Sequence, residues 1–174
     1  MALINTLAFL ARHPLTRRHK LQALRRFLAW QLGSRLVPGA VVVDWVQGAK
    51  FLARPGDAGL TGNIYAGLHE FAEMAYLLHV LRPEDLFIDV GANLGSYTLL
   101  ACAALGARGY AFEPVPSNYQ GLLANLRLNA LENQVCCRNQ ALGAEPGQVL
   151  FTDYGSTMDR VLAAGETTAR TRSV

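Results

Sequence analysis

The chain has 174 residues, a formal net charge of +3 at pH 7, and 51% hydrophobic against 17% charged residues. This composition is typical of a globular protein and excludes a disordered chain, and the length suits one domain with a buried core. The apolar runs fall short of the roughly 18–20 residues that a membrane-spanning helix needs. We therefore expect a cytoplasmic protein with no transmembrane segment, attached to a membrane at most peripherally.

Most of the excess positive charge lies near the N-terminus, in Arg12, Arg17, Arg18, Lys20, Arg25 and Arg26. A basic face can contact a membrane surface or nucleic acid, but it is more often the solvated side of a helix, so we expect no nucleic-acid partner. The cysteines Cys102, Cys136 and Cys137 have the spacing of neither a disulfide framework nor a zinc site. We expect them to be reduced packing residues, and we expect no metal.

Residues 1–60 predict an N-terminal unit of helices and a small β-hairpin. Helical patterning covers residues 1–36, with a break at Pro14. The second helix has the pattern of an amphipathic helix, with Arg26 turned away from an inward apolar face. That face consists of Leu21, Leu24, Leu28 and Leu32. Residues 41–46 and 50–53 predict the two strands of the hairpin.

Residues 61–154 predict a doubly wound α/β domain. Turn-forming residues over 56–63 predict a loop, and apolar spacing predicts a helix over 68–81. Strands then alternate with helices, which is typical of a parallel sheet buried on both faces. The strands are expected over 86–90, 109–113, 134–142 and 149–152, and the helices over 96–105 and 117–131. Residues 155–174 predict an irregular tail, so the sheet looks incomplete at its C-terminal end.

The candidate ligand-binding residues follow the first two strands of this domain. Asp89 closes the first strand, and Gly91 and Gly95 follow in a turn where a ligand can approach the backbone and the next helix N-terminus. Glu113 closes the second strand, at about the 20-residue spacing at which an acid accepts hydrogen bonds from ribose hydroxyls. The order of strand, glycine turn, helix, strand and acid predicts a nucleoside-binding site.

The spacing of the glycines favours one class of nucleoside ligand. A dinucleotide fingerprint, Gly-x-Gly-x-x-Gly, would need glycine where Asn93 or Tyr97 stands. The spacing Asp-x-Gly-x-x-x-Gly leaves room for an adenosyl group with an amino-acid tail, whose cationic end Asp89 can hold. A pyrophosphate would prefer backbone N–H groups without a nearby carboxylate. The residues therefore favour a methyl donor over a nicotinamide dinucleotide.

Three segments resemble the FkbM family of methyltransferases. They are residues 87–98 (Phe-Ile-Asp-Val-Gly-Ala-Asn-Leu-Gly-Ser-Tyr-Thr), 111–119 (Ala-Phe-Glu-Pro-Val-Pro-Ser-Asn-Tyr) and 125–129 (Asn-Leu-Arg-Leu-Asn). Residues 62–71 and 139–143 are similar to two further segments of that family. The resemblance implies a class I methyltransferase (Rossmann-like) fold, which the helical patterning of residues 1–36 supplements with an N-terminal helical extension. It also implies S-adenosylmethionine as cofactor and, often, O-methylation of a small-molecule or glycan-like acceptor.

The resemblance also implies roles for individual residues. The donor loop would consist of Asp89, Gly91, Asn93 and Gly95, and Glu113 would bind the ribose. The adenine pocket would be formed by Pro114, Val115, Gln140 and Ala141. The methionine end would be flanked by Tyr65 and Glu70, with His69 beside them. We expect Tyr97 and Tyr119, which lie at helical core spacing, to be packing residues.

The family continues with a strand ending in an Ile-Asp-Val-Glu-Gly-type motif, and this chain lacks that motif. We therefore expect a C-terminally truncated methyltransferase and assign no catalytic base. Two alternatives stay open. The chain could be an inactive remnant or a nucleoside-binding module, or, more weakly, an NAD-dependent oxidoreductase.

Overall fold

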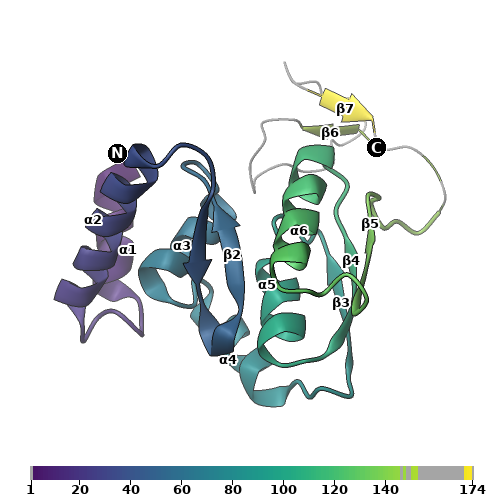
Figure 1. Ribbon diagram of the computed structural model, residues 1–174, viewed down its shortest axis with the longest axis horizontal. Coiled ribbons are helices and arrows are strands. Elements are labelled where there is room, and N and C mark those ends of the chain that lie inside the picture. The colour runs from purple at the N-terminus through teal and green to yellow at the C-terminus, as the bar shows by residue number, and fades with distance from the viewer. Residues whose placement is uncertain (1, 146, 148–149, 153–170, 174) are drawn as a thin grey trace.

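The computed structural model describes residues 2–145, 147, 150–152 and 171–173. Figure 1 shows three parts side by side: a helical pair, a hairpin with one helix, and a sheet with its helices. The pair is α1 (Ala2–Arg12) and α2 (Lys20–Leu36). The middle part is β1 (Val41–Asp44), β2 (Lys50–Ala53) and α3 (Ala58–Ala66), with a 3₁₀ turn over Val46–Gly48. No helix in the described residues is both long and apolar enough to cross a membrane.

The sheet part contains three parallel strands in the order β3, β4, β5. Its elements are α4 (Phe71–Val80), β3 (Leu86–Val90), α5 (Ser96–Leu99), β4 (Arg108–Phe112), α6 (Pro116–Leu128) and β5 (Val135–Arg138). A π-helical segment, Leu100–Ala104, continues α5. The parallel sheet and its alternating helices confirm the predicted α/β architecture, and each of these elements lies within a few residues of its predicted place.

Two predictions about local structure are wrong. The predicted loop over residues 56–63 contains most of helix α3, because tertiary packing overrides the turn-forming residues. A Cβ at Gly62 would lie 2.5 Å from the His69 ring, so this glycine lets the side chain of His69, beyond the end of α3, approach the helix closely. The predicted irregular tail contains a strand, β7 (Thr171–Ser173), which pairs antiparallel with β6 (Leu150–Thr152). Residues 153–170 and 174 of the tail lie outside the described residues.

Helix α2 faces the opposite way from the prediction. Its buried residues are Ala23, Phe27, Trp30 and Ser34. The predicted inward leucines, Leu21, Leu24, Leu28 and Leu32, are all exposed. The aromatic rings of Phe27 and Trp30 bury more apolar area than leucines would, which explains the orientation. The helix therefore has apolar residues on both its inner and its outer side.

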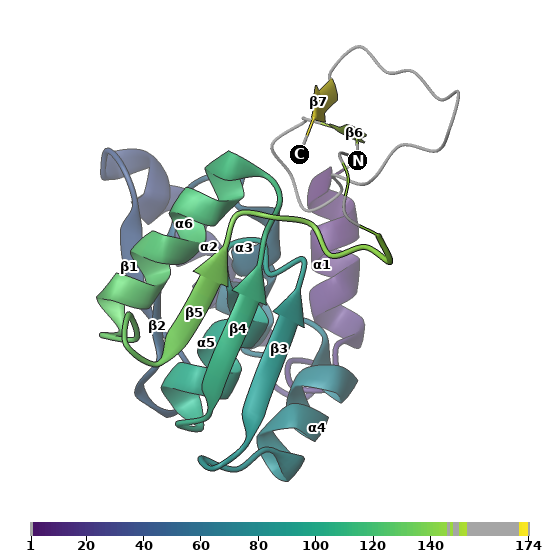
Figure 2. The same cartoon turned by 90° about the vertical axis from the view of Figure 1, so that its right-hand side faces the viewer.

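The sheet is covered on one face rather than on two. Figure 2 shows β3, β4 and β5 in front, with α5 and α6 behind them. Leu86, Ile88, Val90 and Tyr110 are exposed on the front face, and no described helix covers them. Within the described residues, the prediction of a sheet buried on both faces is therefore wrong. The alternation of exposed and buried positions along β3 follows the two-residue period of a strand.

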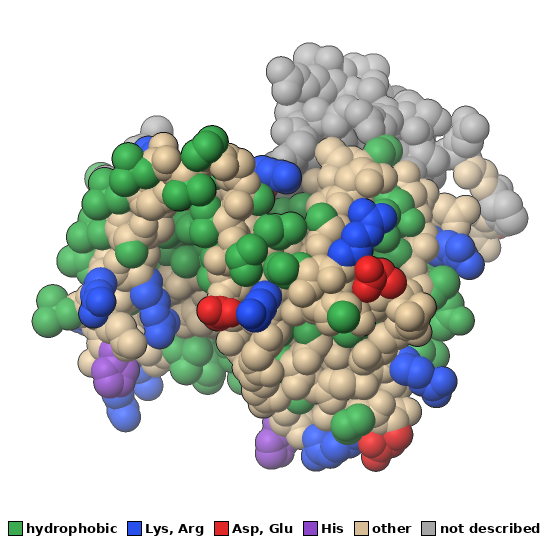
Figure 3. Space-filling model, viewed as in Figure 1, with side chains coloured by type: hydrophobic (Ala, Val, Ile, Leu, Met, Phe, Trp, Pro, Cys, Tyr) green, Lys and Arg blue, Asp and Glu red, His purple; other side chains and the backbone are tan. Residues whose placement is uncertain are grey.

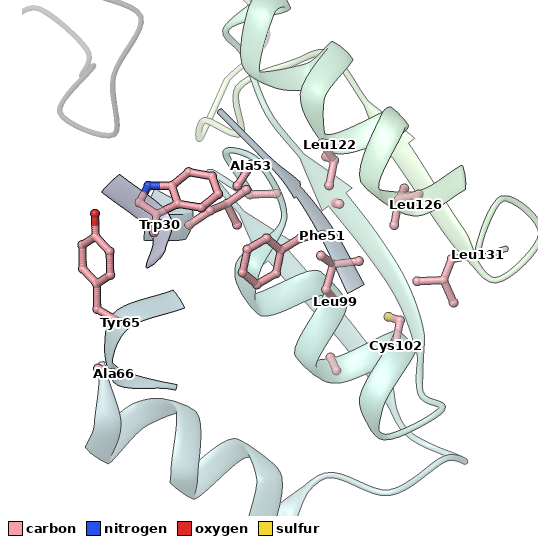
Figure 4. Close-up of a cluster of buried hydrophobic side chains, with 14 of the residues drawn as sticks. Trp30, Phe51, Ala53, Tyr65, Ala66, Leu99, Cys102, Leu122, Leu126 and Leu131 are labelled. Carbon is pink, nitrogen blue, oxygen red and sulfur yellow. The ribbon is translucent and has the colours of Figure 1, made fainter. Parts of the chain in front are cut away.

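One hydrophobic core joins the parts on either side of residue 60. Trp30 from α2, Phe51 from β2 and Tyr65 from α3 lie in one cluster with Leu99 and Leu122 from the sheet part (Figure 4). Phe51, Leu99 and Leu122 are completely buried. The N-terminal unit therefore shares its packing with the residues that follow it.

Asn125 of α6 and Asn129, which directly follows that helix, bond the hairpin to the sheet part. Asn125 Oδ1 accepts a hydrogen bond from Leu52 N at 2.7 Å, and Asn129 Oδ1 accepts one from Lys50 N at 2.8 Å. Asn125 Nδ2 also donates to Leu94 O at 2.7 Å. Asn125 is 1% exposed, so its side chain bonds are made inside the protein. The hairpin is thereby linked to the loop that follows β3.

The orientation of α2 predicts a sharp contrast between neighbouring residues. Phe27→Ala removes a buried ring and should lower the free energy of unfolding by about 3–5 kcal/mol. Leu28→Ala shortens an exposed side chain and should change it by roughly 0.5 kcal/mol or less. Denaturant unfolding of both variants and the parent chain measures the difference. A larger loss for Leu28→Ala than for Phe27→Ala would contradict the orientation.

Candidate functional site

The loop after β3 is held by the backbone of β4. Gly91 N and Ala92 N both donate to Phe112 O, at 2.8 and 3.0 Å. Gly95 N donates to Ala92 O at 2.8 Å, which closes the turn. The loop therefore continues the pairing of the two parallel strands beyond their ends and places its residues at the carboxyl edge of the sheet, where ligands bind in folds of this class.

Gly91 and Gly95 both have positive φ values, +79° and +95°, but their surroundings differ. Nothing lies within 4 Å of a Cβ built at Gly91, so its backbone borders open space. A Cβ at Gly95 would lie 2.7 Å from Leu122 Cδ1. Gly91 thus leaves the loop accessible to a ligand, whereas Gly95 permits α6 to pack closely against the loop.

The Glu113 carboxylate holds the loop from the end of β4. Its Oε2 accepts a hydrogen bond from Asn93 N at 2.8 Å, and its Oε1 accepts one from Val115 N at 2.9 Å. The side chain is 4% exposed, and burial raises the pKa of this carboxyl although these hydrogen bonds oppose the shift. Each ionised carboxylate oxygen can accept more than one hydrogen bond, so acceptor capacity remains for a ligand.

Asp89 lies at the end of β3 and is also nearly buried. Its Oδ2 accepts a hydrogen bond from Thr98 Oγ1 at 2.5 Å. Burial is the main cause that raises the pKa of Asp89, and the Thr98 hydrogen bonds oppose it. Thr98 comes from the first turn of α5, so the loop and its helix hold this carboxyl in one orientation.

A cleft of about 340 Å³ opens between α4 and this loop. Its lining residues are Gly59, His69, Glu70, Met74, Asp89, Gly91, Ala92, Asn93, Ser96 and Tyr97. Tyr97 Oη donates a hydrogen bond to Glu70 Oε2 at 2.8 Å. Burial and the nearby Glu70 carboxylate raise the pKa of Tyr97, so its hydroxyl stays a donor.

The cleft brings together several residues that the sequence assigns to a site. Five of them line it: His69, Glu70, Asp89, Gly91 and Asn93. Glu113 lies next to these residues through its bond to Asn93 N. Tyr97 packs against the buried cluster of Leu68, Met74 and Leu100, as expected, and it also lines the cleft and bonds Glu70. Only the three-dimensional path of α5 reveals this role, because core and cleft positions share the same helical spacing.

The predicted place of Tyr65 is wrong. Its ring packs edge-on against Phe27, with centroids 5.1 Å apart, and its hydroxyl accepts a hydrogen bond from Gln31 Nε2 at 2.9 Å. The side chain is buried, contacts α2 and is not among the residues that line the cleft. Tyr65 is therefore a core residue that joins α3 to α2.

The residues assigned to the adenine pocket follow the ends of β4 and β5. Pro114 and Val115 are buried, whereas Gln140 is exposed and Ala141 is half-buried. Asn139 Nδ2 donates to Glu113 O at 2.7 Å and to Pro114 O at 3.0 Å, which ties the two segments together. Sequence analysis assigns no role to Asn139, and this pair of bonds supplies one.

The chain was compared with known proteins at the level of sequence. No protein-family profile matches it. It is 41% identical over 89 residues to the 31-O-demethyl-FK506 methyltransferase FkbM of Streptomyces tacrolimicus, over 48% of this chain and 33% of that protein. The chain spans about a third of the length of this curated relative.

Two solved structures are similar in fold. TYW2 of Pyrococcus horikoshii, solved in complex with MeSAdo, matches with a TM-score of 0.50 and 21% identity, over 64% of this chain and 40% of that chain. A SAM-dependent methyltransferase from Agrobacterium tumefaciens matches with a TM-score of 0.46 and 17% identity, over 60% of this chain and 33% of that chain. The likeness to TYW2 confirms the expected class I methyltransferase fold, of which the described residues supply three parallel strands.

The two loop glycines should respond differently to the same substitution. Gly95→Ala adds backbone strain and a collision with Leu122, so it should lower the free energy of unfolding by about 2–5 kcal/mol. Gly91→Ala adds strain alone and should cost about 1–2 kcal/mol. Thermal or denaturant unfolding of the two variants, compared with Gly147→Ala at an open position, measures both losses. Equal losses for Gly91→Ala and Gly95→Ala would contradict the close packing of α6 on the loop.

Proposed function

We propose that the cleft binds S-adenosylmethionine and that the chain is the donor-binding part of a methyltransferase. The observation on which this rests is the charge of the cleft. Glu70 and Asp89 both line it, and the described lining residues include no lysine or arginine. A ligand with a positive end is stabilised there by the carboxylates, whereas a pyrophosphate would be repelled. S-adenosylmethionine has both a sulfonium and an ammonium group at its methionine end.

The surrounding residues fit the rest of such a ligand. The open backbone at Gly91 gives an adenosyl group access to the loop, since a side chain there would fill the space. Glu113 has remaining acceptor capacity for ribose hydroxyls. We propose that Pro114 and Val115 on one side, and Gln140 and Ala141 on the other, enclose the adenine. The bonds from Asn139 to Glu113 O and Pro114 O support this pocket, because they hold the two segments together.

When bound, S-adenosylmethionine supplies a methyl group that is already activated by the positive sulfur. This chain's residues then contribute alignment, which is the main catalytic requirement of such a transfer. Glu70 would hold the ammonium group, with its carboxylate fixed by Tyr97, and Asp89 would face the same end of the ligand from β3. We assign no base among the described residues.

We further propose that the acceptor atom is an oxygen of a small molecule or a glycan-like compound. The support is the curated relative, whose name describes methylation at an oxygen of an FK506 precursor. Incubating the chain with labelled S-adenosylmethionine and hydroxylated acceptors tests this step. Donor binding without transfer to any acceptor would instead favour the alternative of a nucleoside-binding module.

Calorimetric titration with S-adenosylhomocysteine tests the donor site itself. The parent chain should bind it, and Glu70→Gln should weaken binding about 10- to 100-fold because a charged hydrogen-bond partner of the ammonium group is lost. Glu73→Gln is the matched control, since it removes an exposed carboxylate from the first turn of α4, three residues after Glu70 and outside the cleft lining. Binding of NAD but not of S-adenosylhomocysteine would overturn the proposal, as would equal effects of the two substitutions.

The pH dependence of the same titration gives an independent test. Burial raises the pKa of both Asp89 and Glu113, so these groups become protonated at a higher pH than an ordinary carboxyl near about 4. The ionised forms bind the ligand, so affinity should be greatest above the raised pKa values and fall as the pH is lowered through them. In Asp89→Asn the affinity should depend less on pH than it does in the parent chain. Affinity that increases on acidification, with circular dichroism unchanged, would contradict this role.

A further inference from the structure

The outer side of α2 presents a continuous row of leucines to solvent. Four of them follow one another at four-residue spacing, so they lie on one side of the helix. We call this row the leucine ridge; it consists of Leu21, Leu24, Leu28, Leu32 and Leu36, whose side chains are between 39% and 84% exposed. The opposite side of α2 fills the core. The ridge is therefore not needed to hold the helix in place, and its exposure is costly in water.

The same segment is positively charged and contains no acidic residue before Asp44. Its cations are Arg12, Arg17, Arg18, Lys20, Arg25, Arg26 and Arg35, and all of them are exposed. The one ion pair found among the described residues, Lys50 with Asp44, lies outside this set. Figure 3 shows hydrophobic side chains over the helical end of the molecule, with Lys and Arg side chains among them.

The ridge and the cations lie on the same surface. Arg25 lies four residues from Leu21 and three from Leu28 along α2. Arg35 lies three residues from Leu32, so both arginines border the ridge. Arg17, Arg18 and Lys20 lie at the start of the helix. A long arginine or lysine side chain can lie along apolar surface while its charged end reaches polar groups. The combination is that of a helix lying in the interface of a bilayer.

We propose that α2 attaches the protein to membrane surfaces that contain anionic phospholipids. The leucine ridge would enter the boundary between headgroups and acyl chains, and the surrounding cations would contact lipid phosphates. The charge distribution favours this occupant over the others. A second copy of the chain would bring cations against cations, and a nucleic acid would use the arginines but leave the leucines in water.

Vesicle co-sedimentation tests the proposal. The chain should bind vesicles of phosphatidylcholine mixed with phosphatidylglycerol and bind pure phosphatidylcholine vesicles much more weakly, with binding that falls as salt is added. Leu28→Gln/Leu32→Gln should reduce the partition coefficient roughly tenfold or more, because two apolar side chains no longer leave water. Arg25→Gln/Arg35→Gln should also reduce it, by about fivefold for each charge.

Matched substitutions on other elements distinguish a specific contribution of the α2 surface from a general effect of losing apolar or charged side chains. Tyr76→Gln/Val80→Gln changes an exposed apolar pair with the same four-residue spacing on α4 and should leave vesicle binding unchanged. Arg108→Gln/Arg127→Gln removes two exposed charges elsewhere and should have a much smaller effect than the α2 pair. Circular dichroism of every variant should match that of the parent chain, because all the substituted residues are exposed.

Several results would overturn the proposal. One is the absence of vesicle binding at low salt by a chain with a folded circular dichroism spectrum. Another is an equal loss from the α2 and α4 apolar pairs. Self-association that disappears in Leu28→Gln/Leu32→Gln, without vesicle binding, would assign the ridge to a second copy of the chain. Binding to a single-stranded RNA homopolymer instead of vesicles would assign the cations to nucleic acid.

Discussion

Burial of the Glu113 carboxylate is the constraint on which the candidate site depends. One side chain at the end of β4 accepts the N–H of Asn93 in the loop and the N–H of Val115 at the start of α6. A buried carboxylate without such partners would be strongly destabilising, so the loop and the side chain hold each other in a single geometry. A fixed loop suits a site whose main task is to align a ligand.

Most strands and helices of the sheet part can be predicted because each is marked by a pattern within its own short stretch of sequence. The strands at 86–90 and 109–113 are short apolar runs bounded by turn-forming residues, and the helices between them have apolar spacing. Helix α3 and the orientation of α2 could not be predicted in the same way. Leucines at regular spacing mark an apolar side, but Phe27 and Trp30 compete for the interior, and only the shape of the core decides between them.

The residues of the candidate site also differ in whether they could be predicted from the sequence. Asp89, Gly91 and Glu113 could be found from the sequence because strand ends in a parallel sheet meet at one edge, and the structure places them there. Tyr97 could not, since a residue of α5 at core spacing can point either to the core or to the cleft. The family resemblance alone assigned Tyr65 to the methionine end, and its ring belongs instead to the contact between α3 and α2.

The Asn125 side chain has a consequence for how the molecule comes apart. It accepts the N–H of Leu52 in the hairpin and donates to the carbonyl of Leu94 in the loop after β3, and it does both while almost completely buried. Pulling the hairpin away from α6 would leave these groups unpaired inside the protein, which is costly. The hairpin, α6 and the loop therefore behave as one cooperative unit, and local opening at the N-terminal side is coupled to loss of order at the site.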